Sequence, residues 1–165
     1  MTEIDIIPPA IQREWRWPAA VNFILGGAGT GLYLINFMAM FMSKSFSESH
    51  MPVLQSLFSL IIIMLGFLCV SLEIGRPFRG YYTFKRFGTS WISREMIAFT
   101  IFVLAVVLYH FSANGFFNVV AAVSALCLML AQGFIVYSAR AVTSWNTVFM
   151  PFFFLSSGLA SGSGV

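Results

Sequence analysis

Two glutamates, Glu73 and Glu95, are the side chains of this protein best suited to transfer protons. Glu73 closes the second of several long apolar runs and Glu95 opens the third, so the chain folds back between them. Carboxyl groups at membrane depth are rare and usually functional. Because burial disfavours the charged form of a carboxyl group, both residues can accept or release protons near neutral pH. The simpler alternative is that Glu73 pairs with Arg76 or Arg79 and that Glu95 only stabilises a helix N-terminus.

A basic connection separates the two acids. It holds five of the nine Lys and Arg residues of the chain, namely Arg76, Arg79, Lys85, Arg86 and Arg94. Phe78, Tyr81 and Tyr82 recur among these bases at helical spacing, which is typical of a short helix lying on lipid headgroups. We predict that the five basic side chains dock an acidic soluble partner. Anchoring to lipid headgroups alone is the alternative.

Other polar side chains map to the same end of the expected helices. Asn22 lies about one turn into the first apolar run, and Tyr137 ends the fourth. A buried Asn in lipid must be hydrogen-bonded, so bonding between helices is the plain alternative for it. Together, Asn22, Glu73, Arg76, Glu95 and Tyr137 suit a neutral ring carbonyl with an apolar tail. The amide and phenol donate to the carbonyl, and a carboxyl group handles the proton.

The residues that could ligate a metal are few and scattered. His50 and His110 fall near connections on the opposite, charge-poor side, so a haem b anchor of the cytochrome type is a competing hypothesis that their spacing disfavours. Cys69 and Cys127 lie inside apolar runs, where Cys is usually a small hydrophobe. Because the sequence has no CxxC and no Cys/His cluster, we expect no haem, iron–sulfur cluster or metal in this chain itself.

The apolar runs that position these residues predict an all-α integral membrane protein. The chain is 59% hydrophobic and only 9% charged, whereas soluble domains carry about 25% charged residues. Each of the first four runs offers about 19–25 residues, enough to cross a hydrocarbon core of ~30 Å. We expect one domain over residues 1–165, a bundle of about five transmembrane helices. The expected spans cover about 18–42, 52–71, 93–111, 116–137 and 148–165. The fifth run reaches the chain end without a flanking charge, which suggests a piece of a longer protein.

The distribution of charge predicts orientation and narrows the function classes. Eight of the nine Lys and Arg residues lie on one side of the expected bundle, and only Lys44 lies on the other. The positive-inside rule places the N-terminal lead and the 72–94 connection in the cytoplasm. The bases gather in connections and form no broad face, which argues against nucleic-acid binding. No span centre is charged, which argues against the other alternative, a transporter or channel fragment.

Small residues cluster in the first and fifth runs. Gly27 and Gly31 form one small-xxx-small pair, and Gly158 and Gly162 form another. Such pairs let helix backbones approach closely in lipid, so we predict helix packing at both. A phosphate-binding glycine loop is the weaker alternative, because the GxGxxG spacing and a preceding strand are both missing.

Two short stretches resemble a known family. LEIGRPFR at 72–79, followed by TSWISRE at 89–95, resembles the NrfD-like membrane-anchor subunits of dimethyl sulfoxide reductase-type and polysulfide reductase-type molybdopterin oxidoreductase complexes. The opening Trp17-Pro18 with Asn22 is similar to the first helix of these anchors. The segment 141–146 is similar to their proline-alanine-tryptophan loop.

The resemblance implies a function and a set of partners. Such anchors bind a quinone or quinol, menaquinone or ubiquinone, at the membrane edge. They exchange electrons with an iron–sulfur subunit, which serves a molybdopterin or tungstopterin catalytic subunit. The protein itself would be a quinone-reactive, non-catalytic subunit in the cytoplasmic membrane of a prokaryote. Quinone binding would involve Asn22, Glu73, Arg76, Glu95 and Tyr137, and also Trp91 of the second stretch.

The sequence departs from the family pattern at two places. Glu73 occupies the position of a motif histidine, whereas Glu95 matches the motif glutamate. Thr143 and Ser144 stand where the tryptophan loop usually has proline. Family members have about eight helices, each able to cross the bilayer, so this sequence corresponds to a little over half of one.

Overall fold

The computed structural model describes residues 17–42, 53–72, 88–139 and 145–165, and these fold as α-helices with short connections. The five helices are α1 (Trp17–Met42), α2 (Val53–Ser71), α3 (Trp91–Ser112), α4 (Gly115–Tyr137) and α5 (Met150–Ser163). The described residues contain no strand, which confirms the all-α prediction.

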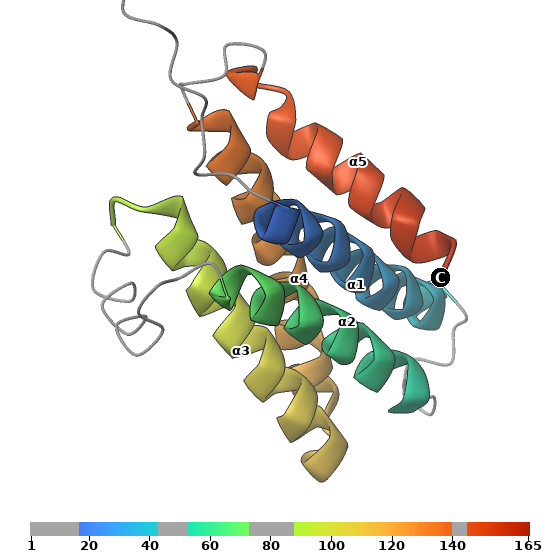
Figure 1. Cartoon of the computed structure of the whole chain (residues 1–165). Coiled ribbons are helices and arrows are strands. Elements are labelled where there is room, and N and C mark those ends of the chain that lie inside the picture. The colour runs from blue at the N-terminus through green and yellow to red at the C-terminus, as the bar shows by residue number, and fades with distance from the viewer. Residues whose placement is uncertain (1–16, 43–52, 73–87, 140–144) are drawn as a thin grey trace, which may run out of the picture.

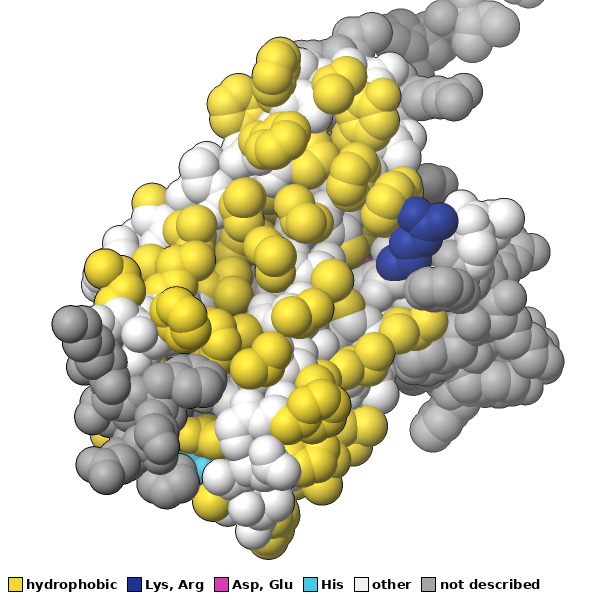
Figure 2. Space-filling view, turned by 180° about the vertical axis from the view of Figure 1, so that it is seen from behind, with side chains coloured by type: hydrophobic (Ala, Val, Ile, Leu, Met, Phe, Trp, Pro, Cys, Tyr) yellow, Lys and Arg dark blue, Asp and Glu magenta, His cyan; other side chains and the backbone are white. Residues whose placement is uncertain are grey.

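Four of the helices are long enough and apolar enough to cross a membrane. Helices α1, α2, α3 and α4 have 26, 19, 22 and 23 residues, which gives lengths of roughly 28–39 Å at 1.5 Å per residue. Helix α5 has 14 residues, or roughly 21 Å, and is therefore shorter than the predicted fifth span. Large apolar side chains cover much of the outer surface, as expected where lipid is the solvent (Figure 2).

The helices pack as a bundle around α1 and α4, in which successive helices alternate in direction and the neighbours α1 and α5 run parallel. Helix α1 lies between α2 and α5, and α4 runs behind α1 (Figure 1). Helices α3 and α4 form a tight hairpin. Ala113 adopts the left-handed conformation at φ 50° to end α3, and its N–H donates to the Tyr109 carbonyl. The Asn114 side chain then accepts from the backbone N–H of Phe116 at 2.9 Å and begins α4.

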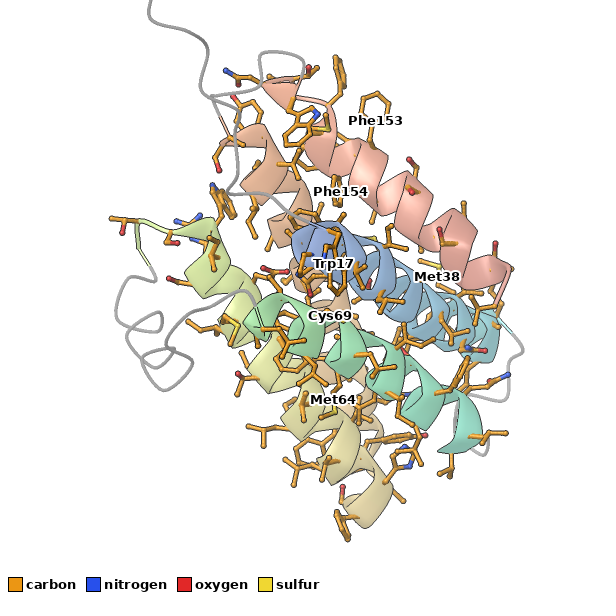
Figure 3. The ribbon with its side chains drawn as sticks, in the orientation of Figure 1. Trp17, Met38, Met64, Cys69, Phe153 and Phe154 are labelled. Carbon is orange, nitrogen blue, oxygen red and sulfur yellow. The ribbon has the colours of Figure 1, made fainter. Side chains whose placement is uncertain are left out.

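The two glycine pairs pack against each other between α1 and α5, which confirms the predicted helix packing. A Cβ at Gly31 would collide with the backbone carbonyl of Gly158, and one at Gly162 would collide with the backbone of Gly31 and Leu32. Beside this seam the ring of Phe154 points toward α1, whereas Phe153 points away from the bundle (Figure 3). Small residues therefore bring the backbones of α1 and α5 into direct contact.

A buried pair of hydrogen-bonded side chains, Tyr33 and Asn118, lies toward the end of the bundle near the α3–α4 hairpin. The Tyr33 hydroxyl donates to Asn118 Oδ1 at 2.7 Å, and the Tyr33 ring meets Phe102 edge-on at 5.1 Å. All three side chains are fully buried. The hydrogen bond ties α1 to α4 at a depth where lipid offers no partner.

Candidate functional site

Three polar side chains from three helices meet inside the opposite end of the bundle. Asn22 lies five residues after the start of α1, Glu95 four after the start of α3, and Gln132 five before the end of α4. At 1.5 Å per residue, each sits roughly 6–8 Å inside its helix end. Because helices that follow one another in the chain alternate in direction, the starts of α1 and α3 and the end of α4 lie on one side, and the three side chains share one depth.

The three side chains form one hydrogen-bonded cluster, named here the Glu95 cluster. Asn22 Nδ2 donates to Glu95 Oε1 at 3.2 Å, and Gln132 Nε2 donates to the same oxygen at 3.1 Å. Asn22 is 3%, Glu95 4% and Gln132 0% exposed. Burial favours the neutral form of a carboxyl group, and amide donors favour the charged form. Burial and the two amide donors therefore act on Glu95 in opposite directions. Such a balance suits a group that takes up and releases protons.

Three buried polar atoms of the described residues have no hydrogen-bond partner, and two of them belong to the amides that hold the carboxyl group. They are Asn22 Oδ1, Gln132 Oε1 and Ser93 Oγ. Buried polar groups are normally paired, because an unpaired one costs about 1–3 kcal/mol. The two amide oxygens beside the carboxyl group can only accept hydrogen bonds, so they are suited to a polar molecule that carries O–H groups.

Glycines make room for the Glu95 cluster. A Cβ at Gly26 would collide with the Gln132 amide, so only glycine there lets the amide lie against α1. At Gly66 of α2 the fit is tight but less strict, because an added Cβ would lie 3.3 Å from the backbone and side-chain oxygens of Asn22. The glycine cluster of the first helix therefore positions polar residues as well as packing on α5.

An aromatic stack lies at the same end of α3 and α4. The Trp91 ring stacks on Phe134 at 4.2 Å and 9°, and Phe134 meets Tyr137 edge-on at 6.5 Å. The Arg94 guanidinium lies over Trp91, 4.2 Å from the ring centroid, and donates to the Gly88 carbonyl at 3.1 Å. In Figure 2 a basic patch lies at one edge of a mostly hydrophobic face, and Arg94 is the Lys or Arg that the described residues contain. A flat aromatic surface with a cation thus lies at the same end of α3 and α4 as the Glu95 cluster.

An apolar groove of about 630 Å³ begins at this stack and follows α3 and α4 toward their hairpin. Trp91 and Phe134 line one end, and Ile101 and Val119 lie farther along. Ala131, the neighbour of Gln132 in the sequence, also lines the groove, whereas Asn22, Glu95 and Gln132 do not. The groove can hold an apolar chain whose head lies near the stack.

The structure brings together some of the predicted site residues. Asn22 and Glu95 are hydrogen-bonded, and Trp91 and Tyr137 belong to the neighbouring stack through Phe134. Arg94 of the predicted docking group lies on that stack as well. The remaining predicted site and docking residues lie outside the described residues: Glu73, Arg76, Arg79, Lys85 and Arg86.

Only one of the two histidines, His110, lies among the described residues. His110 Nε2 lies 2.7 Å from the Ser56 hydroxyl, near the hairpin end of the bundle and away from the Glu95 cluster. His50 lies outside the described residues, so the two-imidazole arrangement is not tested. Within the described part of the protein, no three His, Cys, Asp or Glu side chains are grouped as metal ligands would be.

Sequence reasoning missed Gln132, Ser93 and the role of Gly26. Gln132 carried a signal that could have revealed it, because a polar side chain within an apolar span must find a buried partner. The sequence Ala131-Gln132-Gly133 also flanks it with small residues that permit close packing. Ser93 gave no such signal, because serine is common near helix ends.

The fold and the Glu95 cluster define a multi-pass α-helical membrane protein with a buried polar cluster near one end of its helices. Comparison with known families agrees with this class. The family model of the DMSO reductase anchor subunit (DmsC) matches residues 13–165. The protein therefore belongs to the DMSO reductase anchor subunit family.

Individual relatives are distant. The sequence is 24% identical over 162 residues to the anaerobic dimethyl sulfoxide reductase protein YnfH of Escherichia coli K12, with 88% of this sequence and 54% of that one covered. It is 26% identical over 87 residues to another anaerobic dimethyl sulfoxide reductase polypeptide from the same organism, with 52% and 30% covered. It is also 26% identical over 162 residues to a sulfite dehydrogenase polypeptide of Allochromatium vinosum, with 82% and 49% covered. The sequence spans about half the length of its more fully aligned relatives, and no solved structure is significantly similar to it.

Proposed function

We propose that this protein is the quinone-reactive part of a membrane anchor. It exchanges electrons between the quinone pool and a docked iron–sulfur subunit, which serves a molybdopterin or tungstopterin catalytic subunit. The observation that carries the proposal is the buried Glu95 carboxyl group, held by two amides whose own oxygens, Asn22 Oδ1 and Gln132 Oε1, have no hydrogen-bond partner. A quinone has ring oxygens that accept hydrogen bonds, and a quinol has hydroxyl groups that donate them.

Each part of the site has a role in this proposal. Glu95 exchanges the proton, and Asn22 pairs with a ring oxygen. The ring lies near Trp91 and Tyr137 at the aromatic stack, and the apolar tail follows the groove along α3 and α4. Glu73 and Arg76, which lie outside the described residues, remain predicted members of the same site.

Docking of the soluble subunits is assigned to the basic connection. Arg94 lies at the end of the bundle that holds the Glu95 cluster, so a partner bound there lies near the quinone. We assign the same role to Arg76, Arg79, Lys85 and Arg86. By the positive-inside rule this side is cytoplasmic, and the membrane is the cytoplasmic membrane of a prokaryote.

The relatives support a shared anchoring role but name different substrates. One belongs by name to a dimethyl sulfoxide reductase and another to a sulfite dehydrogenase. The sequence identity of this protein to both relatives is similar, so we assign the choice of substrate to the catalytic subunit. The anchor supplies the quinone chemistry that such complexes share.

The proposal is tested by Glu95→Gln in membranes that carry the assembled complex. Turnover coupled to quinone should fall by about 100-fold, the usual contribution of a positioned acid or base. Turnover of the soluble subunits with an artificial dye should stay unchanged. Thr100→Val is the matched control, because Thr100 lies on the same helix, is exposed, and bonds only to the Met96 carbonyl of its own helix. Equal loss of both activities in Glu95→Gln would assign Glu95 a structural role instead.

A further inference from the structure

The two amides of the Glu95 cluster donate to a single carboxyl oxygen. Asn22 Nδ2 and Gln132 Nε2 both bind Oε1. Among the described side chains, no other group donates to the carboxyl, and neither amide reaches Oε2. The two oxygens of Glu95 are therefore unequal, since Oε1 is occupied by amide protons and Oε2 is not.

The position of Gln132 is determined by close packing on both sides. Its amide lies over Gly26 of α1, where a Cβ would collide with Nε2. The next residue, Gly133, packs against Pro151 of α5, where a Cβ would meet the Pro151 backbone. Because α4 is held between α1 and α5 at this level, the Gln132 side chain has little freedom to leave Oε1.

We infer that Gln132 is a positioning residue for the proton-exchanging carboxyl group. With Asn22 it holds Oε1, which turns Oε2 into the oxygen that exchanges protons with the bound ring. Gly26 serves the same purpose indirectly, because it provides the space that the amide occupies. This inference rests on the proposed quinone function and adds residues to it that sequence analysis did not select.

The proton step balances at Oε2. When a quinol is oxidised, a ring O–H bond breaks and an O–H bond forms at Oε2, while the amide protons stay on their nitrogens. The two electrons released in forming the quinone pass to the iron–sulfur partner of the proposed function. Glu95 carries one proton at a time and releases it before accepting the second. Reduction of a quinone follows the same path in reverse.

The experiment compares Gln132→Ala, Gly26→Ala and the double variant in membranes carrying the assembled complex. Asn118→Ala is the matched control. It removes an equally buried amide from the same helix, but at the far end, where the partner is Tyr33. Two readouts are needed: kcat and KM for quinone-coupled turnover relative to dye turnover, and the infrared C=O stretch of protonated Glu95. That band is identified by its loss in Glu95→Gln.

Gln132→Ala should lower the coupled kcat about tenfold, as expected for one lost hydrogen bond to a reacting group, and leave KM within about twofold. The C=O band should move to higher wavenumber because an amide donor is lost. Gly26→Ala should shift kcat and the band in the same direction by displacing the amide. It should add nothing further in the double variant, where no amide remains to displace. Asn118→Ala should leave the coupled kcat and the band unchanged.

The outcomes separate this inference from the proposed function. An unmoved C=O band in Gln132→Ala, or an equal loss of coupled turnover in Asn118→Ala, would overturn the positioning role. Loss of turnover in Glu95→Gln with full turnover in Gln132→Ala would overturn the positioning role alone. Full turnover in Glu95→Gln would overturn both proposals. If Gln132→Ala fails to assemble, Gly26→Ala decides the matter, because it retains all three side chains of the cluster and only displaces the Gln132 amide.

Discussion

Replacing Glu95 by leucine should destabilise the bundle, whereas glutamine at the same position should not. Leucine removes the acceptor Oε1 and leaves the amides of Asn22 and Gln132 without it. Hydrogen bonds between membrane helices contribute about 0.6 kcal/mol on average and up to about 1.7 kcal/mol. Losing two of them should lower the free energy of unfolding by about 1–3 kcal/mol.

Glutamine keeps an amide oxygen where Oε1 lies and places its NH₂ group at the position of Oε2. Both hydrogen bonds of the cluster can therefore persist, and the change in unfolding free energy should be less than about 1 kcal/mol. The contrast between the two variants separates stability from proton exchange. Glu95→Gln should lose quinone-coupled turnover while keeping the stability that Glu95→Leu loses.

The measurement is reversible unfolding in mixed micelles, followed by helix content and by fluorescence. Trp91, stacked on Phe134 next to the cluster, gives a local signal. Thr100→Leu is the control, because its exposed hydroxyl bonds only within α3 and should be replaced without effect. The reasoning is refuted if Glu95→Leu unfolds at the same free energy as the unchanged protein. It is also refuted if glutamine destabilises the bundle as much as leucine does.

Four further predictions concern other parts of the bundle. Gly31→Leu should collide with the Gly158 carbonyl and separate α1 from α5, lowering the unfolding free energy by about 1–3 kcal/mol. Gly115→Ala, where a Cβ meets nothing within 4 Å, should change it by less than about 0.5 kcal/mol in the same unfolding assay. Tyr33→Phe removes a buried hydrogen bond and should reduce the free energy of unfolding by about 1 kcal/mol. The ratio of quinone-coupled to dye turnover should not change in that variant, and a fall in the ratio would assign Tyr33 to the quinone path. Arg94→Glu should reduce the amount of soluble subunit retained on washed membranes, and more so as salt is raised; unchanged retention at every salt concentration would remove Arg94 from the docking surface.

The sequence by itself determined the class of the protein and the positions of the long apolar helices among the described residues. Apolar runs of bilayer length can fold only as helices in lipid, because every backbone polar group must be paired within the segment. The first four predicted spans agree with the helices to within two residues at each end. The fifth is the exception, since α5 begins at Met150 and ends at Ser163.

Parts of the candidate site were also readable from single residues. Asn22 and Glu95 stood out because polar side chains in apolar runs are few. Their shared depth followed from the alternating direction of successive helices. The glycine pairs of the first and fifth runs likewise predicted a close contact that the structure shows.

Only the tertiary structure decided which side chains meet. That Gln132 joins Asn22 at one oxygen of Glu95 depends on the rotation of α4 about its own axis, and local sequence does not fix that rotation. It is set by contacts between distant segments, such as Gly26 against Gln132 and Gly133 against Pro151. Helical periodicity tells which residues share a face of one helix. It does not tell which face of the next helix they will touch, because that depends on packing over the whole bundle.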